Sequence, residues 1–571
     1  MKRFLIPAVT AAALLASASI PATAQTVSGS YLAARSAALQ NDFEQAATYY
    51  AQALARDRRN PELMENLLIA QLSIGQVARA VPVAQVLLDS GMRSQVADLI
   101  LLTDAILAGE YDAFTQTEIT GDGIGPLVDG LVKAWSLMGV GNVAAALETF
   151  DEVAGRVGLD GFALYHKAMA LASAGDFEGA EAIFANDTSG SIIQTRRGVL
   201  ARVQVLSQLQ RNEDAIDLID RAFSGTSDPE IEQMLAMLET GESMPFSYIR
   251  DVQDGVAEVF FSVAAALRSE AAPEFTLLYA QVARALRPSH IDALLLTAEL
   301  LETMEQYEAA IAVYKEVPAD NPAYHAAELG RADALRGLDR QDAAVEVLYQ
   351  LARSHGDLPT VHSALGDALR QMDQFAEAIP AYDKAIELMT DRGGASWFLL
   401  YARAISYERT DQWDAAEADF RAALDLNPNQ PQVLNYLGYS LVEKRTNLDE
   451  ALEMIERAVA ASPNSGYIVD SLGWGLYRLG RYEEAVPHME RAVELLPVDP
   501  VVNDHLGDVY WAVGRYREAE FQWARALSFV DQGETAEEAD PDRIRRKLEV
   551  GLDMVLEEEG APPLKVASDE G

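Results

Sequence analysis

The side chains that could carry out catalysis in this 571-residue chain are its 7 histidines and its 88 acidic residues, since it contains no cysteine. A histidine or carboxylate can act as a general acid or base, and histidines at a helical spacing can ligate a metal ion. No His-Glu-x-x-His, glycine-rich phosphate loop or nucleophile elbow occurs in the sequence. The histidines are scattered, at His166, His290, His325, His355, His362, His488 and His505. We therefore expect no catalytic residue, no metal site, no cofactor and no enzymatic activity.

Another set of side chains recurs at regular spacing and could bind rather than react. Aromatic, amide and acidic residues return every 34 or 35 positions in the C-terminal part of the chain, as in Asn435, Asp470 and Asp504. Aromatic rings supply contact area at a low entropy cost, and carboxylates among them select basic side chains. The candidate partner-binding residues are Tyr401, Asn435, Tyr439, Asp470, Trp474, Tyr477, Asp504, Asp508 and Trp511.

The elements that must position these residues are repeated helix pairs. Gly438, Gly473 and Gly507 each follow a leucine at spacings of 35 and 34 residues, and Pro428, Pro463 and Pro497 keep the same spacings. A period of 34 with helical patterning indicates two antiparallel helices per repeat. We expect the glycine of each first helix to face an alanine of the second, so that the two axes approach closely.

These motifs resemble the tetratricopeptide repeat family over about residues 358–527. One matching unit contains Leu365, Gly366, Phe375, Ala378, Tyr382 and Ala385, and the next contains Leu400, Ala404, Tyr407, Trp413, Ala416, Phe420, Ala423 and Pro428. The segment "RTNLDEA", residues 445–451, carries one extra residue, which should lengthen a turn. The resemblance implies an all-α fold, a tetratricopeptide repeat superhelix (an α-solenoid of antiparallel helix pairs) with a C-terminal capping helix.

The rest of the chain carries the pattern more weakly, for example at Phe43, Phe177 and Tyr307. Residues 240–250 lack helical periodicity and contain Gly and Pro, so we place a joint there. Asp540 and Pro541 predict the start of the capping helix. The predicted divisions are a signal peptide (1–24), degenerate helical repeats (25–240), middle repeats (241–357), a well-formed array (358–527), and the capping helix with an acidic tail, disordered from Glu557 (528–571).

The nine candidate residues lie at steps of three and four along the first helices, on the side turned toward the groove of the array. On this interpretation they form an aromatic and acidic wall that binds a segment of another protein. Asp504 and Asp508 would then be solvated carboxylates that steer a basic partner. The alternative is that Tyr439, Trp474 and Trp511 only wedge adjacent helix pairs apart.

The N-terminus and the charge limit where the protein works and what it binds. Lys2 and Arg3 precede an apolar run that ends at the small-x-small triplet of residues 22–24, the pattern of a secretory signal cleaved after Ala24. The chain has 45 basic and 88 acidic residues, a net charge of −43, which repels phosphate backbones and anionic membranes. We expect a periplasmic protein without a lipid-anchor cysteine that binds basic protein or peptide segments and no nucleic acid.

The closing phrase "SLGWGLYRLGRYEEA", residues 471–485, and the many repeats are similar to a proteobacterial group of envelope tetratricopeptide repeat proteins. That group includes a pseudomonad lipoprotein adaptor of a C-terminal processing protease. The resemblance implies an adaptor that activates a periplasmic protease or presents substrates to it. The alternatives are a scaffold for outer-membrane biogenesis or polysaccharide export and, with least support, a peptidoglycan-acting enzyme.

Overall fold

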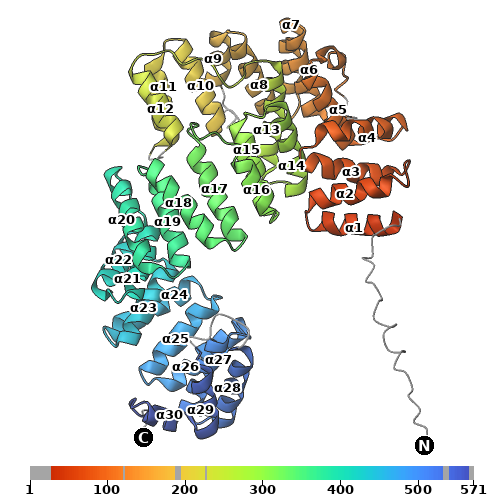
Figure 1. Cartoon of the computed structure of the whole chain (residues 1–571). Coiled ribbons are helices and arrows are strands. Elements are labelled where there is room, and N and C mark those ends of the chain that lie inside the picture. The colour runs from red at the N-terminus through yellow and green to blue at the C-terminus, as the bar shows by residue number, and fades with distance from the viewer. Residues whose placement is uncertain (1–26, 120–122, 187–193, 225–227, 531–538, 565–571) are drawn as a thin grey trace, which may run out of the picture. The chain divides into compact units, whose positions relative to one another are not determined.

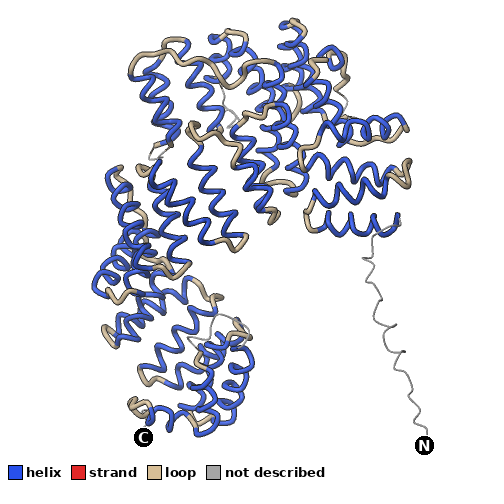
Figure 2. Tube along the Cα trace, viewed as in Figure 1, coloured by secondary structure: helices blue, strands red, loops and turns tan. Residues whose placement is uncertain are grey.

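The computed structural model describes residues 27–119, 123–186, 194–224, 228–530 and 539–564. The chain divides into two compact units, unit 1 (Met1–His355) and unit 2 (Gly356–Gly571). Across the described ranges every regular element is a helix and there is no strand (Figure 2). The predicted all-α solenoid of helix pairs is therefore confirmed, while the predicted signal peptide, 1–24, lies outside the described residues.

Unit 1 contains α1 to α18 and one short 3-10 helix, η1 (Figure 1). Their bounds are α1 Val27–Leu39, α2 Phe43–Leu54, α3 Pro61–Ser73, α4 Val77–Asp89, α5 Gln95–Leu107, η1 Tyr111–Phe114, α6 Pro126–Gly139, α7 Val143–Ala154, α8 Asp160–Ser173, α9 Phe177–Ala185, α10 Arg196–Gln208, α11 Asn212–Phe223, α12 Pro229–Glu239, α13 Val252–Leu267, α14 Pro273–Leu286, α15 Ile291–Thr303, α16 Tyr307–Tyr314, α17 Tyr324–Gly337 and α18 Gln341–Ser354.

Unit 2 contains five consecutive helix pairs, α19 to α28, followed by α29 and α30. Their bounds are α19 Pro359–Gln371, α20 Phe375–Asp391, α21 Trp397–Arg409, α22 Trp413–Leu426, α23 Pro431–Lys444, α24 Leu448–Ala461, α25 Gly466–Arg478, α26 Tyr482–Leu495, α27 Pro500–Ala512, α28 Tyr516–Val530, α29 Pro541–Val550 and α30 Leu552–Glu558.

The repeat is visible in the backbone as a left-handed residue at the turn inside nearly every pair. Such a residue ends the first helix and lets the chain reverse, which is why Gly, Asn and Asp are frequent at these positions. The residues, with φ between 56° and 85°, are Asn41, Gly75, Gly109, Gly141, Gly175, Gln210, Gly241, Glu305, Asp339, Asp373, Asp411, Arg445, Gly480 and Gly514. The turn with the extra residue holds a second one, Asn447.

Two repeats of unit 1 lack a full second helix. After Gly109 the second helix is only η1, and after Gly241 no helix forms before α13 begins at Val252. The segment predicted as a joint, 240–250, is therefore the irregular half of a repeat.

Unit 1 does not stack as a simple line. Helix α14 packs against α3 and α5, and α13 packs against α6 and α8 (Figure 1). The Gln281 side-chain amide donates to the Ser73 carbonyl at 2.7 Å, and the Gln306 amide donates to the Gln40 carbonyl at 3.1 Å. Late and early repeats of unit 1 therefore contact each other, and the predicted division between 25–240 and 241–357 stays a prediction.

In unit 2 the repeat glycines face large side chains. A Cβ on Gly473 would lie 2.3 Å from the Met489 sulfur, and one on Gly507 would lie 2.4 Å from the Trp523 ring. The expectation that these glycines face alanines is wrong. The missing Cβ makes room for one bulky, fully buried residue of the second helix.

The C-terminal cap consists of two helices rather than the single predicted one. Gly551, with φ 85°, separates α29 from α30, and Leu552 begins the second helix. Glu557, where the predicted disordered tail begins, lies inside α30, and residues 565–571 lie outside the described part.

Candidate functional site

The nine predicted residues all lie on first helices of unit 2, namely α21, α23, α25 and α27. Tyr401 packs against Phe420 and Tyr436, with ring centroids 6.0 and 6.1 Å apart, and is half-buried. Its position fits a packing residue of the repeat core. The other eight fall into an open cleft, a stacked cluster and a covered acidic pair.

The open part is a cleft of about 530 Å³, called here the Asn435 cleft, whose lining includes Asn435, Tyr439, Glu443, Tyr467, Asp470 and His505. Tyr467, which was not among the nine, is 61% exposed. The Oδ1 atom of Asn435 is buried and accepts no hydrogen bond from any residue that the structure describes. A buried acceptor of this kind is costly unless a bound group donates to it.

Beside this cleft lies a stack of three rings. The Trp474 ring lies 3.9 Å from that of His505 and 4.8 Å from that of Tyr477, and its Nε1 donates to Glu443 at 3.0 Å. His505 Nδ1 lies 3.1 Å from a carboxylate oxygen of Asp470. Burial alone would lower the pKa of His505, but the charge and hydrogen bond of Asp470 outweigh it and raise that pKa. Trp474 and Asp470 thus join neighbouring first helices.

The acidic pair is not solvated, so the expectation of rim carboxylates at Asp504 and Asp508 is wrong. Asp504 is 8% exposed and Asp508 is 2% exposed. The ammonium of Lys547, from α29, donates to Asp504 at 2.8 and 2.9 Å and to Asp508 at 2.6 Å. Trp523 Nε1 also donates to Asp508 at 2.9 Å. The cap therefore neutralises the pair, and burial raises the pKa of Asp508 against the lowering effect of Lys547.

Trp511 and Tyr477 are also partly covered by the C-terminal cap. Trp511 Nε1 donates to Asp553 at 3.0 Å, and a Cβ on Gly551 would lie 2.4 Å from the Trp511 ring. Tyr477 is 8% exposed, and burial raises the pKa of its hydroxyl. Of the nine residues, Asn435, Tyr439 and Asp470 line the open cleft, and a partner-binding role for any of the nine stays a prediction.

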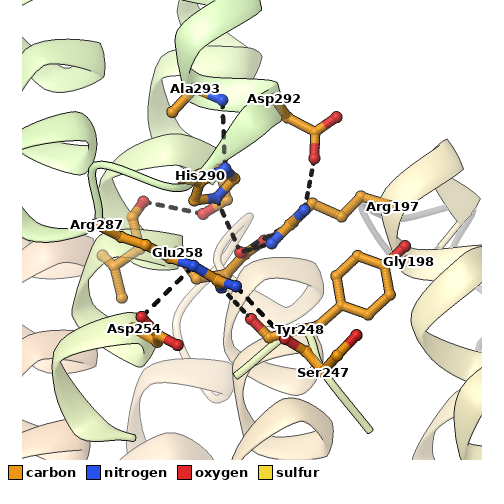
Figure 3. Close-up of polar contacts among 12 residues, drawn as sticks. Arg197, Gly198, Ser247, Tyr248, Asp254, Glu258, Arg287, His290, Asp292 and Ala293 are labelled. Atoms are coloured by element: carbon orange, nitrogen blue, oxygen red, sulfur yellow. Dashed lines mark hydrogen bonds and ion pairs between the residues drawn. The ribbon is translucent and has the colours of Figure 1, made fainter. Parts of the chain in front are cut away.

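Unit 1 holds a buried polar cluster that sequence reasoning missed (Figure 3). Its centre is Glu258 on α13, whose side chain is 1% exposed. Arg197 donates to both carboxylate oxygens at 2.8 and 2.9 Å, and the Tyr165 hydroxyl donates at 2.7 Å. His290 Nε2 lies 3.3 Å away. Burial alone would raise the pKa of Glu258, but Arg197 and His290 outweigh it and hold that pKa well below its usual range.

A cavity of about 550 Å³ lies next to this cluster, and four arginines line it. Each arginine already has a carboxylate partner. Arg196 pairs with Asp228, and Arg197 pairs with Asp292 as well as Glu258. Arg250 and Arg287 both pair with Asp254. The charges are compensated internally, so the cluster fixes the meeting point of α10, α13 and α15.

The sequence carried one signal for this cluster. Glu258 is the lone acid in the apolar run "VAEVFFSVAAAL", residues 256–267, and an isolated acid in a core helix needs a cationic partner. The described ranges contain no trio of His, Asp or Glu side chains placed to hold a metal ion. None of the described helices combines the length and apolar character that a membrane span requires.

Comparison with known proteins identifies the repeats. Sequence models described as tetratricopeptide repeat match residues 31–94, 131–187, 401–466 and 471–537, and another of the same description matches 359–388. A curated relative, TPR repeat-containing protein PA4667 of Pseudomonas aeruginosa, is 31% identical over 115 residues, which is 20% of this chain and 19% of the relative. The chain therefore spans about a fifth of that relative's length.

Solved structures with similar arrangements have low identity. The APC/C hetero-tetramer Cut9-Hcn1 is 13% identical over 91% of this chain and 97% of its own, with a TM-score of 0.37. YrrB, described as a TPR protein with an unusual peptide-binding site, is 19% identical over 34% of this chain and 98% of its own, with a TM-score of 0.27.

Proposed function

The chain is a tetratricopeptide repeat solenoid, and we propose that it is an exported adaptor that holds a segment of a protein partner in the Asn435 cleft. Tetratricopeptide repeats indicate a scaffold for protein–protein interaction. The proposal adds which surface is used, what chemistry it selects and where the protein works.

The observation that carries the proposal is the unpaired Oδ1 of Asn435 in a cleft that also presents an exposed aromatic side chain. An extended segment brings main-chain N–H groups, and one of them donating to Asn435 Oδ1 would remove the penalty of a buried acceptor. Tyr467, at 61% exposure, offers the contact area that an anchor side chain of the partner needs.

The charge of the cleft favours basic segments. Glu408, Glu443, Asp470 and Asp499 line it, against the permanent cations Arg409 and Lys444. The selection that was first assigned to Asp504 and Asp508 falls to these residues, because Lys547 already neutralises that pair. Charges at such a rim act mainly on the association rate and its salt dependence.

A captured-protein comparison tests the binding surface. Wild-type chain and the double variant Asn435→Ala, Tyr467→Ala would each be used to capture proteins from envelope extract. The matched control is Tyr349→Ala, which removes a 39% exposed tyrosine of unit 1 outside the cleft. We expect a partner captured by wild type and control and lost from the double variant. The same proteins captured by all three would overturn the proposal.

The envelope location and the protease are supported by the N-terminal pattern of residues 2–24, by the absence of cysteine and by the resemblance of residues 471–485 to envelope adaptors. We expect the periplasmic protein to begin at Gln25, which N-terminal sequencing measures, and Met1 on that protein would contradict export by cleavage. A C-terminal processing protease should be among the proteins lost from the cleft variant. Its absence from every capture would remove the protease from the proposal and leave the adaptor role.

A further inference from the structure

The last described residues of the chain turn back toward the repeat array. Helix α30 ends at Glu558, Gly560 is left-handed with φ 64°, and the Ala561 amide donates to the Leu556 carbonyl at 2.8 Å. This reversal directs the tail segment, residues 561–564 (Ala-Pro-Pro-Leu), across the face of unit 2. Leu564 is partly buried against the main core of unit 2.

Between the tail segment and the repeats lies a hollow of about 500 Å³, called here the Tyr477 cleft. On the repeat side its lining includes Trp474, Tyr477 and Tyr482, and on the other side Leu556, Pro562 and Leu564. The Trp474 and Tyr477 rings stack on each other, and Tyr477 and Tyr482 lie with centroids 5.5 Å apart. The repeat side is therefore a continuous aromatic wall.

An aromatic wall is the surface that proline-containing segments fit. Consecutive prolines favour the extended polyproline II conformation, carry no N–H donor and lose little entropy on binding, so they dock by ring packing on aromatic grooves. The tail segment provides two prolines and an apolar residue in that order. The chain thus places a proline-containing segment of its own against its own aromatic surface.

We infer that the Tyr477 cleft is a binding surface for extended, proline-containing apolar segments, and that residues 561–564 occupy it in cis until a partner segment of the same chemistry displaces them. This surface is separate from the Tyr467 side of the Asn435 cleft, so binding there does not depend on the adaptor proposal. A tethered segment acts at a local concentration of about millimolar. A free segment should therefore compete poorly with an intact tail and well with a weakened one.

The experiment uses the full chain and a fluorescent peptide with the sequence of residues 559–564, Glu-Gly-Ala-Pro-Pro-Leu. In the tail variant, Pro562→Ser, Pro563→Ser and Leu564→Ser are combined. Fluorescence anisotropy measures the affinity of each chain for the peptide. We expect the tail variant to bind it at least tenfold more tightly than wild type.

Two controls separate this surface from folding effects and from the Asn435 cleft. In the tail variant, Trp474→Ala should remove binding, whereas Tyr467→Ala should leave it unchanged. Because Trp474→Ala could disturb the helix pair, a peptide with both prolines replaced by alanine is tested on the unaltered tail variant and should bind at least fivefold more weakly. Equal affinity of wild type and tail variant, no binding by the tail variant at millimolar peptide, or equal affinity for the alanine peptide would overturn the inference.

Discussion

Replacing Lys547 by methionine tests whether the cap is held to the repeats by a buried ion cluster. The Lys547 side chain is 0% exposed, and its ammonium makes its three contacts, at 2.6 to 2.9 Å, with the two carboxylates of α27. Methionine keeps most of the aliphatic stem and removes the charge. The substitution therefore leaves Asp504 and Asp508 buried beside each other, with Arg543 still 3.8 Å from Asp508.

The size of the effect follows from what is left unpaired. Removing one partner of a buried ion pair costs about 3–5 kcal/mol, because the remaining charge stays in a poorly solvated site. Some of that loss returns when a carboxyl takes up a proton. Burial already raises the pKa of Asp508 and Lys547 opposes that rise, so the pKa should climb further without the lysine. A raised carboxyl pKa in the folded state means that stability increases as the pH falls through it.

The assay is urea unfolding of the full chain followed by circular dichroism and tryptophan fluorescence, since Trp523 contacts the cluster directly. We expect Lys547→Met to lower the free energy of unfolding of unit 2 by about 3–5 kcal/mol at pH 8 and by less at pH 5. Lys384→Met is the matched control, because Lys384 is 40% exposed and pairs only with Glu387 on its own helix turn. That exposed pair should contribute less than about 1 kcal/mol.

A loss for Lys547→Met no larger than the loss for Lys384→Met would refute the reasoning, because it would mean that the cluster is solvated. A loss that is equal at pH 5 and pH 8 would refute the part that concerns proton uptake. Replacing both carboxylates by asparagine should also destabilise unit 2, by leaving the lysine unpaired.

Three further predictions concern packing and two buried histidines. Gly473→Ala should cost about 1–3 kcal/mol, because its Cβ would lie 2.3 Å from the Met489 sulfur, and the cost should shrink in a Met489→Ala background; equal costs in both would contradict that contact. The stability that wild type holds over His505→Gln should be full below about pH 6.5 and decline as the pH rises through the raised pKa of His505, as measured by urea unfolding. His166→Gln should behave oppositely: burial lowers the pKa of His166 to about 4, so wild type should lose stability relative to the variant between pH 6.5 and 4, and parallel curves would contradict this.

The repeat period predicted the helices of unit 2 well, because each repeat depends on local features such as a left-handed turn residue and an apolar face. It predicted the location of Gly473 on a first helix but not the side chain opposite. A spacing of 34 residues fixes where a glycine lies along its helix, whereas the contact with Met489 depends on how the two axes cross.

The contacts that escaped prediction join residues outside the period. Lys547 reaches Asp504 over 43 residues, and no repeat arithmetic places a cap side chain there. Gln281 reaches Ser73 over 208 residues, because the rotation between successive repeats brings α14 onto α3. That rotation sums many small packing differences along unit 1, and a single sequence does not reveal it.

The open acceptor in the Asn435 cleft gains meaning from its equivalents in the next two repeats. Asn435, Asp470 and Asp504 occupy the same place, 35 and 34 residues apart. Asp470 is paired by His505 and Asp504 by Lys547, each from the element that follows, whereas Asn435 Oδ1 accepts no hydrogen bond from any described residue. Only one of the three equivalent places is therefore left for a partner to fill.

This comparison supplies a variant that closes the cleft with the protein's own chemistry. Ser471 lies 34 residues before His505, so Asn435→Asp with Ser471→His copies the Asp470–His505 pair one repeat earlier. We expect the double variant to keep its helical circular dichroism and its unfolding midpoint, because the same pair is already accommodated in the next repeat. Partner capture should fall as it does for Asn435→Ala with Tyr467→Ala, since the new histidine takes the place of the partner's donor. Undiminished capture by a folded double variant would mean that the partner does not donate to residue 435, and that the binding energy comes from the Tyr467 side of the cleft alone.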